Sequence, residues 1–330
     1  MKAGKNILLT FDYEPYLGAQ SGSAQKCLLE PTEALQQILN KHKAKAIFFI
    51  DTLYLENLKK NGENKEEYDK VIAQLKQLYA HGHFIFPHLH PHWKDSVYIS
   101  ENKEFSLTKL TNYSIANLPE QEIQKLFSDS LNFLKNLGIT FEKWGYRAGG
   151  WCIQPFSKFR NIFKEENIYY EFSVLPGYKN ENHSQAFDFS AVQTQNPYFF
   201  TERVEQPEAK GPFIEFPIST IYFTRNVLFR DRLIRKYLWK TGDKGWGTGT
   251  SAQTDKLKSV FTHREMASIE LLTLAKLSTY KKHLTNNNYM HWISHPKMFT
   301  KHGLKTFDAF LEFATRKFNT NFDFTKIEVR

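Results

Sequence analysis

The stretch Gly82-His83-Phe84-Ile85-Phe86-Pro87-His88-Leu89-His90-Pro91-His92-Trp93 carries four histidines at the end of a short apolar run. Proline at position 91 disfavours a regular helix, so the histidines are expected on a loop that leaves a buried strand. Neutral imidazole is a common ligand of zinc and similar metals. A catalytic metal site needs about three protein ligands and an open position. The rest of the chain must therefore supply an oxygen ligand, a base and an acid.

Outward from this stretch, apolar runs alternate with segments of helical periodicity along nearly the whole chain. Strands are predicted at 5–11, 44–50, 83–86, 144–147, 169–174, 213–218 and 289–294, and helices at 31–42, 66–80, 119–137, 156–165, 263–283 and 304–318. This alternation predicts a parallel sheet, and the length of 330 residues favours a distorted (β/α) barrel. No internal repeat or linker divides the sequence, which predicts a single domain over 1–330 with a basic insert near 224–250.

The chemically capable residues fall at or just after the ends of these predicted strands. They are Asp12, Glu14, His88, His92, Arg147 and His295. The carboxyl ends of parallel strands open on one face of a barrel, so these dispersed residues are expected to gather there.

The composition excludes some classes of protein. The sequence has no apolar run of the roughly 18 to 20 residues that a spanning helix needs. Two cysteines provide no disulfide framework, and the start of the chain meets charge early, so we expect a cytoplasmic protein. The net charge of +9 favours anionic partners, but no nucleic-acid module accompanies it, and nucleic-acid binding is not expected.

Four motifs in order resemble those of the NodB-type polysaccharide deacetylases, a family of carbohydrate esterases. They are Thr10-Phe11-Asp12-Tyr13-Glu14-Pro15, Gly82-His83 with His88 and His92, Tyr146-Arg147 with Gly149-Gly150-Trp151, and Ser294-His295-Pro296. The resemblance covers about residues 7–297. It implies a distorted (β/α) barrel with a divalent metal, most commonly zinc, that removes acetyl groups from sugars.

Carried over onto this sequence, the resemblance makes His88 and His92 metal ligands. It makes Asp12 the catalytic base, Arg147 the residue that orients it, and His295 the acid. The family's first motif commonly has two adjacent aspartates, whereas Tyr13 stands at the second position here. Side chains at i and i+2 on a strand share a face, so Glu14 is the expected third metal ligand. The opposite assignment, with Asp12 on the metal, would leave the base unidentified.

Other residues are expected to support these roles. Trp151, His90 and Tyr13 are the expected substrate contacts, with His90 supporting the loop rather than binding metal. The resemblance also implies an acidic residue that tunes the acid histidine, and Glu171 and Asp188 are the two candidates. The expected chemistry is attack of an activated water on the acyl carbonyl, with proton removal by Asp12 and proton donation by His295.

The basic segment 224–240 lies outside the motifs. It interleaves apolar residues with arginine and lysine, which fits either peripheral membrane contact or a surface helix docked on the barrel.

The predicted function is metal-dependent removal of an N-acetyl or other acyl group from an amino sugar in cytoplasmic synthesis of a bacterial surface polysaccharide. The sugar could be free, nucleotide-linked or carrier-linked. Two alternatives stay open: hydrolysis of a small non-sugar amide, and a non-catalytic carbohydrate-binding protein, for which Tyr13 in place of aspartate is the sole support.

Overall fold

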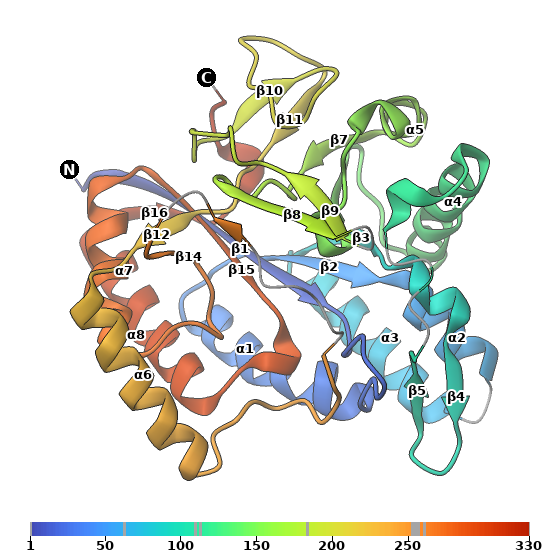
Figure 1. The fold of residues 1–330 in the computed structure, drawn as a ribbon, viewed down its shortest axis with the longest axis horizontal. Helices are drawn as coiled ribbons and strands as arrows, with labels where there is room; N and C mark the ends of the chain where they lie inside the picture. The colour runs from blue at the N-terminus through green and yellow to red at the C-terminus, as the bar shows by residue number, and fades with distance from the viewer. Residues whose placement is uncertain are drawn as a thin grey trace.

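A curled sheet of nine strands forms the centre of the molecule (Figure 1). The computed structural model describes residues 2–61, 64–108, 111, 114–182, 185–251, 258–259 and 262–329. Along the sheet the order is β10 (Tyr198–Phe200), β11 (Phe213–Glu215), β7 (Ile168–Glu171), β6 (Trp144–Ala148), β3 (Phe84–Leu89), β2 (Ile47–Asp51), β1 (Gly4–Tyr13) and β15 (Tyr289–Ser294), and β16 (Asn319–Asn321) also pairs with β1.

The strand pairs of this sheet are parallel, apart from β10, which runs antiparallel to β11. After β11 the chain crosses to the far end of the sheet, where the Ser219 amide donates to the His291 carbonyl in β15. Helices surround this curled sheet, so the predicted distorted (β/α) barrel is confirmed.

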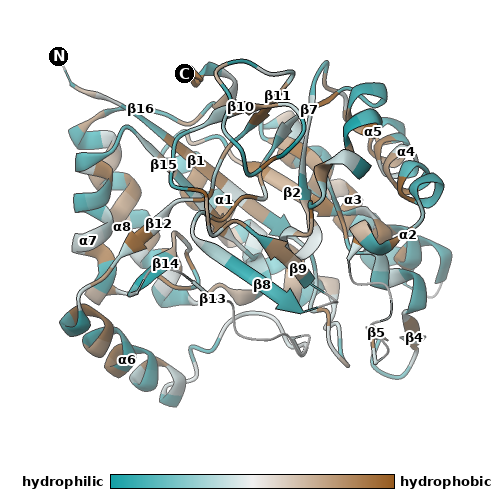
Figure 2. Ribbon diagram, turned by 45° about the horizontal axis from the view of Figure 1, so that its top comes forward, coloured by the Kyte–Doolittle hydropathy of each residue, from teal (hydrophilic) through white to brown (hydrophobic). Residues whose placement is uncertain are grey.

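Most helices pack an apolar face on the sheet, as the colouring in Figure 2 shows, whereas α6 (Arg225–Lys240) lies at the edge of the molecule with apolar side chains exposed. The helices are α1 (Glu30–Lys41), α2 (Thr52–Asn61), α3 (Lys65–Ala80), α4 (Glu120–Asn136), α5 (Arg160–Glu165), α6, α7 (Leu274–Asn286) and α8 (Lys301–Lys317). Short π- or 3-10 segments are η1 (Gln25–Leu29), η2 (Pro91–Asp95), η3 (Ile115–Asn117), η4 (Gly149–Trp151), η5 (Phe156–Lys158), η6 (Pro296–Met298) and η7 (Phe324–Lys326). Within the described ranges, no helix is long and apolar enough to cross a membrane.

Three small antiparallel sheets lie outside the barrel. They join β12 (Thr220–Tyr222) to β14 (Arg264–Met266), β8 (Tyr178–Asn182) to β9 (Gln185–Asp188) and β13 (Lys258–Ser259), and β4 (Val97–Ile99) to β5 (Glu104–Ser106).

The barrel interior is filled with aromatic rings at the end where the strands begin. Phe324, from the C-terminal η7, contacts the rings of Phe84, Phe86, Phe172 and Phe216 at centroid distances of 4.7 to 5.9 Å. Buried apolar residues on both faces are typical of parallel strands covered by helices. This packing closes one end of the barrel and leaves the polar residues at the other.

The helix predicted over 263–283 is wrong in its first half. Arg264–Met266 forms β14 and pairs with β12, and α7 begins only at Leu274. Strand pairing outweighs the local helical pattern here, as tertiary context often does. This difference matters because the connection between β14 and α7 carries Glu270, a residue of the site described next.

Candidate active site at the carboxyl ends of the strands

A small buried cavity opens at the carboxyl ends of β1, β3, β6 and β15, with a volume of about 90 Å³. Its lining consists of Asp12, Glu14, Leu17, His88, His90, Ala148, Gly150, Trp151, Gln185 and His295. The predicted gathering of Asp12, Glu14, His88 and His295 on one face is therefore observed.

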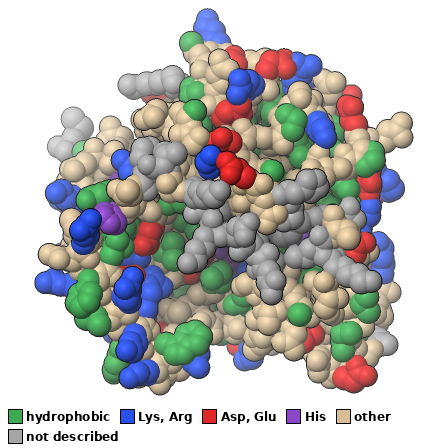
Figure 3. Space-filling model, viewed as in Figure 1, with side chains coloured by type: hydrophobic (Ala, Val, Ile, Leu, Met, Phe, Trp, Pro, Cys, Tyr) green, Lys and Arg blue, Asp and Glu red, His purple; other side chains and the backbone are tan. Residues whose placement is uncertain are grey.

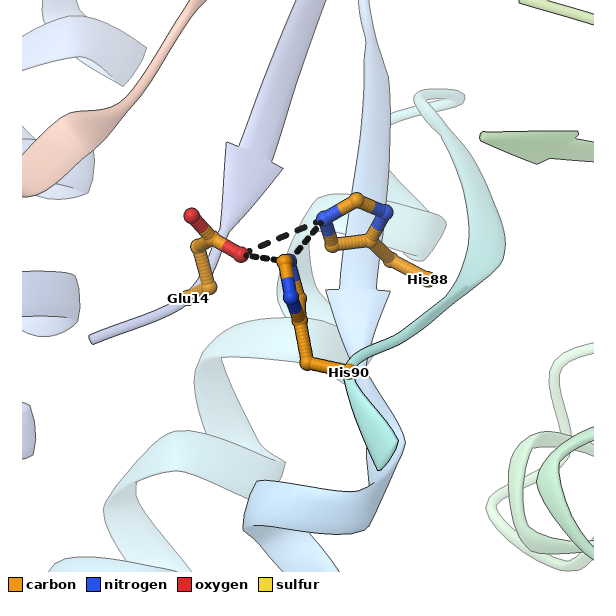
Figure 4. Close-up of side chains that lie close together, drawn as sticks. All are labelled: Glu14, His88 and His90. Atoms are coloured by element: carbon orange, nitrogen blue, oxygen red, sulfur yellow. Dashed lines mark hydrogen bonds and ion pairs between the residues drawn. The ribbon is translucent and has the colours of Figure 1, made fainter. Parts of the chain in front are cut away.

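Glu14, His88 and His90 form a compact cluster on one wall of the cavity (Figure 4). Glu14 Oε2 lies 2.6 Å from His90 Nε2 and 3.2 Å from His88 Nε2, and the two nitrogens are 2.9 Å apart. All three side chains are at least 95% buried. Among the described residues, this is the group of three that could hold a metal ion.

The ring orientation of His88 suits metal binding. Its Nδ1 lies 2.7 Å from the carbonyl oxygen of Arg147, which can only accept, so Nδ1 carries a hydrogen. In the neutral ring this leaves the Nε2 lone pair directed at Glu14 and His90. Donors about 2.0 to 2.2 Å from a tetrahedral zinc lie roughly 3.4 Å from one another, so the three donors, now 2.6 to 3.2 Å apart, would move apart slightly to admit the ion. Two imidazoles and a carboxylate with converging donor atoms thus fit a divalent cation.

His90, and not His92, belongs to this cluster. The backbone at His90 is extended, so the alternation of β3 continues and places His88 and His90 on the same side. His92 lies beyond Pro91 in η2, buried, with its ring stacked on Trp93 at 5.5 Å and 5.1 Å from the ring of His90. The structure thus groups His90, rather than His92, with Glu14 and His88, while the roles of both histidines toward a metal stay predictions.

Gly149 makes room for the His90 ring. A Cβ at this position would lie 2.4 Å from the Leu89 carbonyl oxygen and 2.8 Å from two atoms of the ring. The Gly-Gly-Trp motif thus contributes to the cluster through close approach of the backbone.

Asp12 and Arg147 form a buried ion pair on the adjoining wall. Arg147 Nη1 donates to Asp12 Oδ1 at 2.6 Å, and its Nη2 donates to Thr10 Oγ1 at 2.7 Å. Burial opposes the charge on Asp12, but Arg147, His88 and His295 outweigh it and hold the pKa of this carboxyl below its usual range.

His291 is a further hydrogen-bond partner of Arg147. Its Nδ1 donates to the Phe216 carbonyl at 2.9 Å, so its Nε2 can accept from Arg147 Nη2 at 2.9 Å. Burial and the neighbouring guanidinium hold the pKa of His291 well below its usual range. A neutral His291 therefore helps to fix the arginine that holds Asp12.

His295 lies across the cavity with Glu270 behind it. Its Nδ1 is 2.9 Å from Glu270 Oε1, and its backbone amide donates to Glu270 Oε2 at 3.1 Å. Its Nε2 faces Asp12 Oδ2 at 3.6 Å and Glu14 Oε1 at 3.7 Å. Burial opposes protonation, but Glu270 and Asp12 outweigh it and raise the pKa of His295. The ring is thus held ready to donate a proton from Nε2.

The acidic partner of His295 is Glu270, and not Glu171 or Asp188, the two residues expected from the sequence. Glu171 accepts hydrogen bonds from the amide and hydroxyl of Ser173, and Asp188 bonds Ser190 at the surface. Each carboxylate thus binds a serine two residues further along the chain, and Glu270 occupies the position beside His295.

Lys297, also missed by the sequence analysis, binds Glu14 from the far side. Its Nζ donates to Glu14 Oε1 at 2.8 Å and to the Pro15 carbonyl at 2.7 Å. Burial opposes the charge on Glu14, but Lys297 and His90 outweigh it and hold the pKa of Glu14 well below its usual range. Oε1 is thereby occupied by the lysine, while Oε2 faces the histidines.

Of the expected substrate contacts Tyr13 and Trp151, Trp151 lines the cavity and Tyr13 does not. Tyr13 is buried on the opposite side of β1, and its hydroxyl donates to Gln74 of α3 at 2.8 Å. This placement contradicts the expected substrate contact and follows from side-chain alternation along a strand. Trp151 lines the cavity and packs on Phe187 of β9, at a ring distance of 5.8 Å.

Asp51, at the end of β2, fixes the histidine loop. It accepts hydrogen bonds from the Trp93 indole and from the Tyr54 amide. Burial raises the pKa of Asp51 to about 8. A strand-end carboxylate after the run 47–50 was a signal that sequence reasoning could have used, whereas nothing local marks Glu270 or Lys297 as parts of the site.

No family model matches this chain, and no curated protein matches it. Solved structures do. A Mycobacterium smegmatis protein described as a polysaccharide deacetylase is 13% identical, with 94% of this chain and 84% of that chain covered and a TM-score of 0.48. The catalytic domain of a peptidoglycan N-acetylglucosamine deacetylase from Eubacterium rectale is 12% identical, with 99% and 92% covered and a TM-score of 0.43. A 4-alpha-glucanotransferase from Thermococcus litoralis is 14% identical, with 96% and 37% covered and a TM-score of 0.49.

The solved structures similar to this chain include polysaccharide deacetylases and family 4 carbohydrate esterases, the family that its motifs resemble.

Proposed function

We propose that this protein is a metal-dependent hydrolase that removes an N-acetyl or other small acyl group from an amino sugar. The observation that carries the proposal is the arrangement around one cavity of a metal-binding cluster, an arginine-held aspartate and a glutamate-held histidine. A hydrolase of amides needs a base for water and an acid for the leaving nitrogen, and the two groups face each other here at 3.6 Å.

Glu14, His88 and His90 would hold the metal, and their donor set suits zinc. When bound, a divalent ion would supply Lewis acidity toward water and the acyl carbonyl oxygen. His92 supports His90 in this assignment through the ring contact between them.

Asp12 is the proposed base. Its lowered pKa keeps it ionised at neutral pH, and the ion pair with Arg147 fixes Oδ1, which leaves Oδ2 toward the cavity to accept a proton from water. His295 is the proposed acid. Its Nε2 proton goes to the departing nitrogen, and Glu270 holds the ring in position through Nδ1.

The size of the cavity favours a small acyl group. A volume of about 90 Å³ is well below the roughly 300 to 1,000 Å³ of ordinary ligand pockets. An acetyl group would enter, while the sugar ring would stay at the mouth, where the partly buried Trp151 offers an aromatic face. A small non-sugar amide has no sugar ring to rest on Trp151, which makes it the weaker candidate.

The function is tested by acetate release from a panel of N-acetylhexosamines, supplied free, nucleotide-linked and lipid-linked, with the zinc-loaded protein. Release that disappears in His295→Ala supports the proposal, because a contaminating deacetylase would be unaffected. Metal binding without acetate from any sugar would contradict it. The predicted setting, cytoplasmic synthesis of a surface polysaccharide, stays a prediction.

A further inference from the structure

Large apolar side chains are exposed along the outer face of α6. Of the eight exposed large apolar side chains in the described part of the chain, four lie on this helix. They are Phe229, Leu233, Tyr237 and Trp239, with exposed fractions of 62, 52, 66 and 63%. Phe229, Leu233 and Tyr237 are spaced by four residues and so form one stripe. A concentration of exposed apolar side chains on one element marks an interaction surface.

The opposite face of α6 is held on the barrel by a polar anchor. Asp231 is buried and accepts hydrogen bonds from Thr273 and from Arg235, and it forms an ion pair with Lys276 of α7 at 3.1 Å. These contacts fix the rotation of the helix. The apolar stripe therefore lies on the side of α6 that faces away from the barrel.

The outer face of α6 is also strongly basic. Its exposed charged residues are Arg225, Arg230, Arg232, Lys236 and Lys240. Asp231, the one acidic residue within the helix, faces the barrel. Figure 3 shows hydrophobic and Lys or Arg side chains side by side over the lower left, where Figure 1 places α6.

We propose that the outer face of α6 docks onto an anionic lipid bilayer. The apolar stripe would enter the boundary between head groups and acyl chains, and the five basic side chains would lie against lipid phosphates. Charge complementarity selects this partner, since a surface with cations and no carboxylate matches anionic head groups. A helix of 16 residues is shorter than the roughly 20 needed to span, so it lies in the plane of the membrane surface.

The docked helix leads directly to the candidate active site. Residues 241–251 follow α6, and within them the Gly247 amide donates to the Lys297 carbonyl at 2.8 Å. Lys297 in turn holds Glu14. Docking through α6 would thus bring the cavity close to substrates carried on lipids, although the docking itself does not depend on the proposed reaction.

The test is sedimentation of the purified protein with vesicles of phosphatidylcholine alone or mixed with phosphatidylglycerol. We expect binding to the anionic vesicles that weakens as salt is raised. The combined variant Phe229→Ser, Leu233→Ser, Tyr237→Ser should bind at least about tenfold more weakly. The combined variant Arg230→Gln, Arg232→Gln, Lys236→Gln should bind on the order of a hundredfold more weakly.

Matched controls lie elsewhere on the surface. Val97→Ser removes an apolar side chain that is 61% exposed in β4, and Lys59→Gln, Lys60→Gln, Lys76→Gln removes three exposed charges from α2 and α3. Both should bind as the parent does. No binding of the parent to anionic vesicles at low salt would overturn the proposal, and so would equal losses in the controls. Self-association that the α6 variants abolish, without vesicle binding, would assign the face to a second copy instead.

Discussion

The two halves of the candidate site differ in how closely their polar atoms approach one another. In the proposed metal-binding half, the donor atoms of Glu14, His88 and His90 converge within 3.2 Å. In the proposed proton-transfer half, Asp12 and His295 stand 3.6 Å apart, and each is paired with a group behind it, Arg147 or Glu270. The first arrangement suits a cation between the side chains, and the second suits protons that leave and return. The halves should therefore respond differently to mutation.

The largest expected effect comes from Asp12→Asn. The amide keeps the shape of the side chain and cannot accept the proton from water, so kcat should fall by about 10²- to 10⁴-fold. Zinc content, measured by mass spectrometry on the purified protein, should equal that of the parent. Loss of zinc in this variant would make Asp12 a metal ligand and contradict the proposed division into a metal-binding and a proton-transfer half.

The next effect separates His90 from His92. His90→Ala should weaken zinc affinity by at least about a hundredfold, because even residues that merely support a ligand contribute 10- to 100-fold. His92→Ala is the matched control, with a ring that is equally buried two residues away. In a competition with a chelator it should lose less zinc than His90→Ala does. The opposite ranking would restore the ligand pair first expected from the sequence.

Glu270→Gln addresses the proton-transfer half alone. The carboxylate raises the pKa of His295, so the protonated acid persists to higher pH in the parent. Removal of that charge should lower this pKa, move the alkaline limb of the kcat profile to lower pH and reduce kcat by about 10- to 100-fold. Glu171→Gln should leave the limb in place, since Glu171 bonds Ser173 instead. An unchanged pH profile in Glu270→Gln would show that Glu270 does not set the pKa of His295.

A smaller effect is expected from Gly149→Ala. The added Cβ would crowd the Leu89 carbonyl and the His90 ring, so the free energy of unfolding should fall by about 1 to 3 kcal/mol. Urea denaturation measures this change. At Gly4 no atom lies within 4 Å of such a Cβ, and Gly4→Ala should leave stability nearly unchanged. Equal stability of the two variants would show that the close approach at Gly149 is dispensable.

The sequence predicts the fold and most of the cavity because each strand end is a local signal. Asp12 and His88 follow apolar runs directly, and parallel pairing brings such ends together. Glu270 and Lys297 carry no local signal, since their roles arise from long-range packing on His295 and Glu14. The choice between His90 and His92 depends on where the extended backbone stops, which spacing alone does not fix. Tyr13 was misplaced for the same kind of reason, since its hydroxyl partner Gln74 lies on a helix 61 residues away.

The measurement that tests the account most directly is zinc content beside acetate release in Glu14→Gln. With Oε2 replaced or turned away, the cluster loses its oxygen ligand, so zinc and activity should fall together, and excess zinc should restore part of the activity. Asp12→Asn in the same assay should keep its zinc and stay inactive at any zinc concentration. Full zinc occupancy in an inactive Glu14→Gln would contradict the account, because Glu14 would then belong to the proton-transfer half.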